Sequence, residues 1–377
     1  MIYLDHMATT PLDPAAIAAM APWVSGARFG NPHAILNAPG RLAEAAVDEA
    51  YAAVAALIGA SPAEIVLTSG ATESNNLALI GATAPGDHLI TVATEHPAVL
   101  AVAEDLRERG RTVTVVAVDG HGRVSADAIA DAFRPETRLV SVMAVNNETG
   151  ARQPVDAIAR ACRDRGILFH TDATQALTTG RIDVGTTPID LLSLSGHKLY
   201  GPQGIGALFV RAGVALKPLF VGGGQQADRR SGTVPVALAA GLGAACRAAI
   251  AMRDDEGARL QTLRERLWQG LARAVPGIRR TVPADLSNPA CLHVIVPGID
   301  AAEVLLDLPE VAASTGSACA SGGKSPVLKA MGLGPRESFG ALRLGLGRFT
   351  TADEIDRAVA LLAGAIGTVR ADRPAAE

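Results

Sequence analysis

The chain has 377 residues and a near-neutral charge, with 34 Lys and Arg residues against 38 Asp and Glu residues. Basic and acidic residues are mixed along the sequence, so the basic surface of a nucleic-acid-binding protein is not expected. Hydrophobic residues make up 49% of the chain, which excludes an intrinsically disordered protein and allows a sizeable core. Two or three domains, or one large α/β domain with a smaller one, fit this length.

The N-terminus and the apolar segments predict the location of the protein. Asp5 and His6 come before any apolar stretch, so a signal peptide is not expected. The most apolar late segment, residues 236–252, contains Arg247 and is too short and too interrupted for a bilayer span. We therefore expect a cytoplasmic protein that does not bind membranes.

The apolar pattern changes regularly between helical and strand periodicity. A helical face runs through residues 42–58, and apolar β-rich runs follow it. These runs are residues 65–68, 88–92, 112–118, 139–145, 167–171, 191–194 and 205–210. Helical patterns lie between several of them, at residues 98–109, 126–133 and 155–165. Because the strands are apolar on both faces, the pattern predicts an α/β fold with a mainly parallel, seven-stranded sheet and helices on both faces.

A second, smaller unit is expected after the sheet. A helix-rich stretch starts at Pro235, and its Arg and Glu content rises between Arg253 and Arg266, as in a helix that runs along a surface between domains. Strand patterns at residues 292–296 and 341–345 and helical patterns at residues 301–307 and 352–366 then predict a small α+β domain.

Three segments carry side chains suited to one cofactor. Residues 68–76 run from a strand through a glycine turn into a helix, which exposes N–H groups to an anion. Asp172 and Lys198 each follow a strand, at the sheet edge where open α/β folds bind ligands. Taken alone, each of these features could be purely structural: a capped helix, an acidic residue at a strand end, or a solvent-exposed lysine. Together they provide the anion site, the pyridinium partner and the amine that pyridoxal phosphate needs.

Seven motifs, in family order, resemble the cysteine desulfurases of the IscS/NifS type. They are YLDHMATTP at residues 3–11, FGNP at 29–32, TSGATES at 68–74, VNNETG at 145–150, DATQ at 172–175, SGHK at 195–198 and RSGT at 230–233. The resemblance implies the class V aminotransferase branch of the fold-type I pyridoxal phosphate enzymes, which are homodimers. It places residues 13–253 in a large cofactor-binding domain, and residues 1–12 and 254–377 in a small domain.

The resemblance also implies roles for single residues. Lys198 would carry pyridoxal 5′-phosphate covalently, Asp172 would pair with the ring nitrogen, and His96 would stack on the ring and act in catalysis. Gln175 would bind the ring hydroxyl. The phosphate would be held by Ala71, Thr72, Ser195 and His197, with Thr233 supplied by the neighbouring subunit. The substrate carboxylate would meet Asn147 and Arg343, with Asn31 nearby.

The four cysteines divide into three ordinary ones and one candidate nucleophile. Cys162, Cys246 and Cys291 lie on helix or strand patterns, and none has the spacing of a zinc site or a dithiol pair. Cys319 instead lies in the Gly- and Ser-rich run 314–323, which is not a core segment. This run is similar to the SSGSACTS loop of the family, which implies that Cys319 takes sulfur as a persulfide. No resident metal is expected; transient iron–sulfur ligation by Cys319 is the one metal contact considered.

The resulting expectation is conversion of L-cysteine to L-alanine, with sulfur passing from Cys319 to an acceptor protein. Iron–sulfur assembly, tRNA thiolation and DNA phosphorothioation all stay open as destinations. A shorter segment after Cys319 and an early end after the last helix depart from the IscS pattern. Two single residues depart from the pattern as well. Met7 stands where Ala or Ser is usual, and Gly345 stands where Ser is usual. The alternatives are a selenocysteine lyase or aminotransferase of the same fold, or a non-catalytic binding partner.

Overall fold

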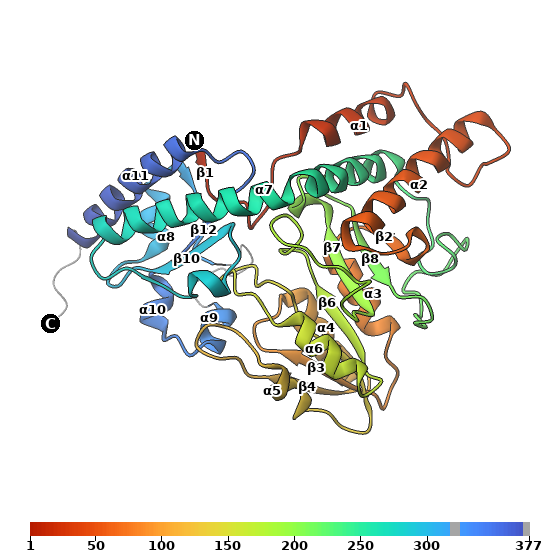
Figure 1. Cartoon of the computed structure of the whole chain (residues 1–377), viewed down its shortest axis with the longest axis horizontal. Helices are drawn as coiled ribbons and strands as arrows, with labels where there is room; N and C mark the ends of the chain where they lie inside the picture. The colour runs from red at the N-terminus through yellow and green to blue at the C-terminus, as the bar shows by residue number, and fades with distance from the viewer. Residues whose placement is uncertain (317–324, 372–377) are drawn as a thin grey trace.

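The computed structural model describes residues 1–316 and 325–371 (Figure 1). Its centre is a seven-stranded sheet with the strand order β2-β8-β7-β6-β5-β3-β4. These strands are β2 (Ile65–Thr68), β3 (His88–Val92), β4 (Thr112–Val116), β5 (Thr137–Ser141), β6 (Leu168–Asp172), β7 (Leu191–Ser195) and β8 (Gly206–Val210). Only β8 runs antiparallel to its neighbours, β2 and β7. The prediction of a mainly parallel sheet is therefore confirmed.

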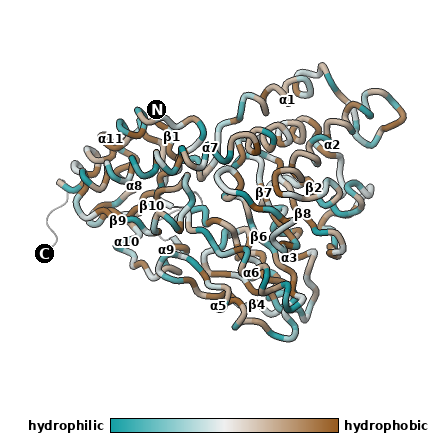
Figure 2. The backbone as a smooth tube through the Cα atoms, viewed as in Figure 1, coloured by the Kyte–Doolittle hydropathy of each residue, from teal (hydrophilic) through white to brown (hydrophobic). Residues whose placement is uncertain are grey.

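Helices cover both faces of this sheet. The helices of this part are α1 (Pro14–Val24), α2 (Ala38–Ile58), α3 (Ala71–Gly81), α4 (Pro97–Glu108), α5 (Ala126–Ala130), α6 (Val155–Arg163) and α7 (Val236–Ala274). Side chains of α3 and α4 form one apolar cluster with the sheet. Side chains of α2, α5, α6 and α7 form a larger cluster on the opposite face. Figure 2 shows the apolar segments concentrated in the strands between these layers.

Local sequence explains where the helices begin and end. The Asn37 side chain accepts a hydrogen bond from the backbone N–H of Gly40, 2.8 Å away, and so caps the start of α2. The helix ends at Gly59, whose φ of 72° is the left-handed conformation that glycine adopts without strain. These signals fix the 21-residue helix that the apolar pattern of residues 42–58 indicates.

The smaller unit is built on two short sheets. A three-stranded antiparallel sheet has the order β12-β10-β9, and β1 pairs in parallel with β11. Its elements are β1 (Ile2–Tyr3), β9 (Arg279–Arg280), β10 (Cys291–Ile295), α8 (Ala301–Leu306), β11 (Val311–Ala312), α9 (Pro326–Ala330), α10 (Pro335–Phe339), β12 (Ala341–Gly345) and α11 (Ala352–Ala371). The first strand of the chain thus belongs to the same unit as the last helix, as Figure 1 shows near the label N.

One helix joins the two units. α7 is unbroken over 39 residues and passes through the predicted boundary at residue 253 (Figure 1). Its first half contributes Leu242 and Cys246 to the core of the large unit, and its second half contributes Leu263 and Leu267 to that of the small unit. Among the residues described, this helix alone is long and apolar enough to cross a membrane by length and composition, and 44% of the relevant window is buried inside the protein. The division into domains stays a prediction.

A buried arginine connects several elements at this junction. The Arg348 guanidinium lies 2.5 Å from Asp13, which caps α1, and 3.2 Å from Glu256 in α7. It also lies 4.2 Å from the centre of the Tyr200 ring, and the Arg348 backbone N–H donates to the Tyr200 hydroxyl. Tyr200 has a φ of 61°, which is uncommon for a bulky residue. The junction therefore holds the segment after Lys198 in a strained conformation.

Candidate active site

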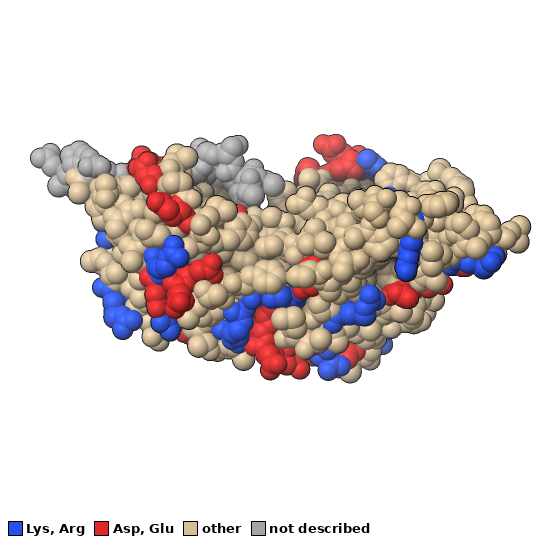
Figure 3. All heavy atoms as spheres, turned by 90° about the horizontal axis from the view of Figure 1, so that it is seen from above, with Lys and Arg blue, Asp and Glu red and all other residues tan. Residues whose placement is uncertain are grey.

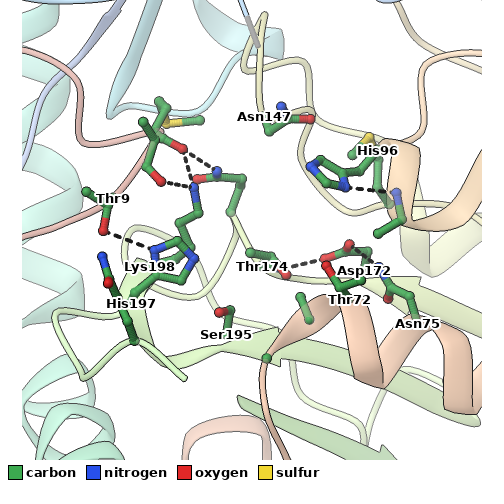
Figure 4. A pocket seen from close by; sticks show the side chains of 18 of the residues that line it. Thr9, Thr72, Asn75, His96, Asn147, Asp172, Thr174, Ser195, His197 and Lys198 are labelled. Carbon is green, nitrogen blue, oxygen red and sulfur yellow. Dashed lines mark hydrogen bonds between the residues drawn. The ribbon is translucent and has the colours of Figure 1, made fainter. Parts of the chain in front are cut away.

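A cavity of about 510 Å³ lies at the carboxyl ends of β6 and β7 and at the start of α3 (Figure 4). Residues 7–9 of the N-terminal segment and Arg343 of β12 complete its lining, so both units contribute to it. This is the sheet edge at which the strand-end residues were expected to meet.

The start of α3 faces the cavity with free backbone groups. Gly70 precedes the helix with a φ of 148°, a conformation that side-chain-bearing residues rarely adopt. The N–H groups of Ala71 and Thr72 belong to the first helical turn, where no earlier carbonyl of the helix can accept from them. A Cβ placed at Gly70 would meet only Ser195 Oγ, at 3.7 Å. The helix start therefore forms an open anion site beside the Ser195 hydroxyl.

An ion pair neutralises the acidic residue of this first turn. Glu73 lies 2.9 Å from Arg230 and also accepts from the Ser69 backbone N–H. Burial raises the pKa of Glu73, but the hydrogen bonds from Arg230 and Ser69 outweigh it, so the pKa is lowered overall. Because the Arg230 charge compensates this carboxylate, Glu73 does not repel an anion at the helix start.

Asp172 is held from two sides at the cavity floor. One carboxylate oxygen accepts from the Asn75 amide at 2.8 Å, and the other accepts from the Thr174 backbone N–H at 3.0 Å (Figure 4). Glu95 is fully buried nearby; burial raises its pKa well above the usual range, the Met143 N–H opposes this, and Asp172 adds to it. The burial of Glu95 therefore favours the neutral form of its carboxyl group.

Lys198 points into the cavity instead of into solvent. It follows β7 in a short turn, and its Nζ donates to the carbonyl oxygens of Met7, at 2.5 Å, and Ala8, at 2.6 Å. The Gln175 amide donates to the same Met7 carbonyl at 2.9 Å. The reading of Lys198 as an ordinary surface lysine is therefore wrong, because this amine is held inside the site.

Two histidines of the cavity are neutral. His96 caps α4 and accepts from the Ala98 N–H through Nδ1, so its proton is on Nε2. Burial lowers its pKa, with Asp172 opposing and Lys198 adding to the effect. Burial lowers the pKa of His197 to about 4, and Lys198 contributes in the same direction. His197 contacts the Thr9 hydroxyl at 3.0 Å, so it also ties the N-terminal segment to the site.

Arg343 presents a guanidinium to the cavity from the small unit. One of its terminal nitrogens donates to the Asn147 carbonyl at 2.9 Å, and the other pairs with Asp5 at 2.8 Å. In the described part of the chain, its Nε is buried and lacks a hydrogen-bond partner. The Asn147 side chain also lines the cavity (Figure 4). A guanidinium and an amide at one end of the cavity suit a carboxylate.

The cavity brings most of the expected site residues together, but not all of them. Asn31 is exposed, accepts from the His33 N–H at 3.0 Å and does not line the cavity of this chain. Thr233 is also exposed and away from the lining, which leaves its expected role in a neighbouring subunit as a prediction. Cys319 lies outside the described residues. The other three thiols are buried, and burial raises the pKa of each to about 12, so they are unreactive.

Sequence reasoning missed several groups that shape the site. The carbonyls of Met7 and Ala8 have no side-chain signature, although both residues lie inside the YLDHMATTP motif. Asn75 lies in the segment of residues 68–76, one helical turn after the anion site. Asp5 is separated from Arg343 by 338 positions, so only the fold brings this pair together.

A model of the family described as aminotransferase class-V matches residues 2–358. The chain belongs to this family. It is 43% identical over 363 residues to "Cysteine desulfurase, mitochondrial" of Drosophila melanogaster, covering 94% of this chain and 78% of that protein. It is 40% identical over 377 residues to "Cysteine desulfurase IscS" of Rickettsia felis, covering 98% of this chain and 92% of that protein.

Solved structures agree with the class-V assignment. A "NifS-like protein" superimposes with a TM-score of 0.91 at 31% identity, covering 97% of this chain and 99% of that one. A structure described as "SspA in complex with cysteine" gives a TM-score of 0.82 at 36% identity, covering 93% and 100%. The fold is thus that of the NifS-like, fold-type I enzymes, which the sequence motifs predict.

Pyridoxal 5′-phosphate is the cofactor of this class-V family, and the cavity of this chain fits it. The helix start of α3 with Ser195 offers an anion site, Asp172 offers a carboxylate, and Lys198 offers a primary amine, all in the same cavity. The Thr174 hydroxyl is buried there without a hydrogen-bond partner within the described residues, as expected for a group that a ligand satisfies.

Proposed function

We propose that this class-V protein is a pyridoxal-phosphate-dependent cysteine desulfurase that converts L-cysteine to L-alanine and passes on the sulfur atom. The observation that carries the proposal is the placement of Lys198, Asp172 and Arg343 in one cavity. Relatives that bear the name cysteine desulfurase match nearly the whole chain at 40–43% identity. An amine, an acid and a carboxylate-binding cation are the groups that amino-acid chemistry on this cofactor requires.

The residues around the cofactor divide the work of binding it. When bound, pyridoxal phosphate withdraws electrons from the α-carbon of an attached amino acid. Asp172, fixed by Asn75, would keep a proton on the ring nitrogen by charge pairing. Ala71, Thr72, Ser195 and His197 would hold the phosphate, and Gln175 would bind the ring hydroxyl. His96, neutral with its proton on Nε2, would stack on the ring.

Lys198 has two tasks in the proposed reaction. Its amine would hold the cofactor in the resting enzyme, and Nζ would be the base that removes the proton from the α-carbon of the substrate and returns one. Arg343 and Asn147 hold the substrate carboxylate during both events, with Asn31 joining them in the assembled enzyme. Held at that end, L-cysteine keeps its α-carbon within reach of one base and its side chain free.

Cys319 is the proposed acceptor of sulfur. Its thiolate attacks the substrate sulfur, so that a new S–S bond forms while the Cβ–S bond breaks. The electron pair of the broken bond stays on Cβ, which takes up a proton and becomes the methyl group of L-alanine. Cys319 keeps the sulfur as a persulfide, from which a protein acceptor takes it for iron–sulfur assembly, tRNA thiolation or DNA phosphorothioation.

The proposed enzyme is a homodimer, and its exposed apolar side chains support this. Leu36 is 96% exposed and Val221 is 85% exposed, and Val24 and Phe29 are about 70% exposed. Figure 3, a view from above Figure 1, shows few charges over the middle of the face seen from that side. Large apolar areas left exposed on one chain mark an interaction surface. In the dimer, Thr233 would complete the phosphate site of the neighbouring subunit. A cytoplasmic location is part of the same proposal.

Single-turnover assays with L-cysteine test the function. We expect one alanine and one trapped persulfide per site in the wild type, and neither product above background in Lys198→Ala. Cys319→Ser should lose the persulfide and at least about 100-fold of the alanine rate, while Cys162→Ala, which removes a buried thiol, keeps both. Equal alanine rates in Cys319→Ser and wild type would contradict the proposal.

Other outcomes would favour the alternatives. Activity restricted to selenocysteine would favour a selenocysteine lyase, and transfer of the amino group would favour an aminotransferase. Absence of any visible absorption from the cofactor would favour a non-catalytic binding partner.

A further inference from the structure

Two glycines at the end of β12 make room for the N-terminal segment. Gly345 donates its N–H to the Leu4 carbonyl at 2.6 Å, and its carbonyl receives the His6 N–H at 3.2 Å. The His6 ring nitrogen Nδ1 also lies 3.0 Å from the Gly345 carbonyl. Residues 4–6 therefore lie along β12 as an added strand, although more than 330 positions separate the two segments.

The space at both glycines is already filled by this segment. A Cβ at Gly345 would lie 2.8 Å from Met7 N and 2.9 Å from Met7 Cγ, and a Cβ at Gly347 would lie 2.0 Å from His6 Cδ2. Real Cβ contacts are essentially never shorter than 3.0 Å. Neither glycine has a left-handed φ, so lack of space, and not backbone conformation, requires glycine here. We call Gly345 and Gly347 the glycine seat.

The residues that fill this space, His6 and Met7, are buried. Met7 is 3% exposed and His6 is 6% exposed. The His6 ring packs edge-on against Tyr3 at 4.8 Å and lies 6.3 Å from the Tyr200 ring. Burial lowers the pKa of His6, so the ring is neutral and acts as a space-filling group.

The same short segment holds the reacting groups of the cavity. The Met7 carbonyl accepts from Lys198 and Gln175, and the Ala8 carbonyl accepts from Lys198. The Asp5 carboxylate pairs with Arg343, which is two residues before Gly345 on the same strand. A displacement of the segment at the glycine seat would therefore move the acceptors of Lys198 and the partner of Arg343 together.

We propose that residues 5–8 are a positioning element for Lys198 and Arg343, and that the glycine seat sets its place. The proposal rests on the proposed role of Lys198 as the cofactor lysine.

Two readouts separate positioning from plain stability. The first is the urea unfolding midpoint of cofactor-free protein. The second is the half-saturating concentration of pyridoxal phosphate for folded protein, followed by visible absorbance and by borohydride trapping on Lys198. We expect Gly345→Ser and Gly347→Ala to lower the midpoint and to raise the half-saturating concentration about tenfold. Gly364→Ala is the matched control, because Gly364 lies in α11 with nothing within 4 Å of an added Cβ; it should leave both readouts unchanged or raise the midpoint.

Double variants identify the contacts responsible. All three close contacts of a Cβ at Gly347 are with the His6 ring, so His6→Ala should restore most of the cofactor binding lost in Gly347→Ala. Met7→Ala should restore only part of the loss in Gly345→Ser, because the contact with Met7 N remains. If Gly345→Ser does not fold, the His6 and Gly347 pair carries the test alone.

The outcomes are distinct. Unchanged cofactor binding in folded Gly347→Ala, or losses that simply add in the double variants, would overturn the positioning role. Trapping of the cofactor on Lys198→Ala protein would overturn the proposed role of Lys198. That result would leave the stability coupling between the glycine seat and the N-terminal segment standing.

Discussion

At the scale of single residues, a buried histidine lies on the same strand as the acid at the cavity floor. His170 lies in β6, two positions before Asp172, and is fully buried between the Ser141 hydroxyl, at 2.8 Å, and the Ser193 hydroxyl, at 3.0 Å. Burial lowers its pKa to about 4, and Asp172 opposes this only in part. A neutral ring satisfies both hydroxyls, because it offers one donor and one acceptor.

The buried state of His170 predicts a loss of stability in acid. Between pH 6.5 and 4 the unfolded chain binds a proton at this ring and the folded chain does not, so the free energy of unfolding falls as the pH is lowered. The expected loss is about 3 kcal/mol at most. Urea unfolding at pH 7.5 and at pH 4.5 measures it. His170→Asn should weaken this pH dependence, whereas the exposed His33→Asn should keep it; equal profiles for the two variants would contradict the prediction.

At the scale of elements, Arg348 is the point where α1, α7 and the segment after Lys198 meet. Asp13 and Glu256 are both less than 9% exposed, so each depends on this guanidinium for compensation. Burial raises the pKa of Glu256, and Arg348 opposes that rise. A buried charge left without its partner is costly, and an exposed one is not.

Arg348→Met should therefore destabilise the protein by about 3–5 kcal/mol. The control is Arg266→Met, because the Arg266–Asp356 pair has the same 2.5 Å separation, but both its side chains are 52% exposed. Its loss should cost much less, because water solvates both charges. Urea unfolding of both variants at neutral pH makes the comparison. Similar losses in the two variants would mean that the buried cluster is not a stabilising junction.

The elements differ in how well sequence predicts them. Strands such as β2 and β3 match the expected residues, because apolar runs between two helical layers have a clear signature. The sequence carries no signature for the continuity of α7. The helix is Ala-rich where it packs on the large unit and rich in Arg and Glu where it packs on the small unit, so its composition changes along its length. Within the site, Lys198 and Asp172 could be predicted from their strand-end positions. The carbonyls of Met7 and Ala8 could not, because only tertiary structure determines where a backbone oxygen points.

At the scale of the whole molecule, the exposed apolar side chains of the large unit predict self-association. Wild-type protein should sediment with twice the mass of the 38.5 kDa chain. Leu36→Asp, at the most exposed of these side chains, should weaken the dimer at least about tenfold by placing a charge in the interface. Leu306→Asp is the control, because Leu306 is 80% exposed but lies on α8 of the small unit. Analytical ultracentrifugation distinguishes them; a monomeric wild type would exclude the dimer.

The seating of the N-terminal segment on β12 also sets the order in which the molecule is completed during synthesis. Residues 2–8 are synthesised more than 300 residues before β11 and β12, on which they lie. The sheet and α7 can form before that point, since domains fold as their residues emerge. The acceptors of the Lys198 amine then reach their positions only after β12 has been translated. A ribosome stalled before β12 would therefore carry a folded sheet in which the Lys198 amine lacks its Met7 and Ala8 acceptors.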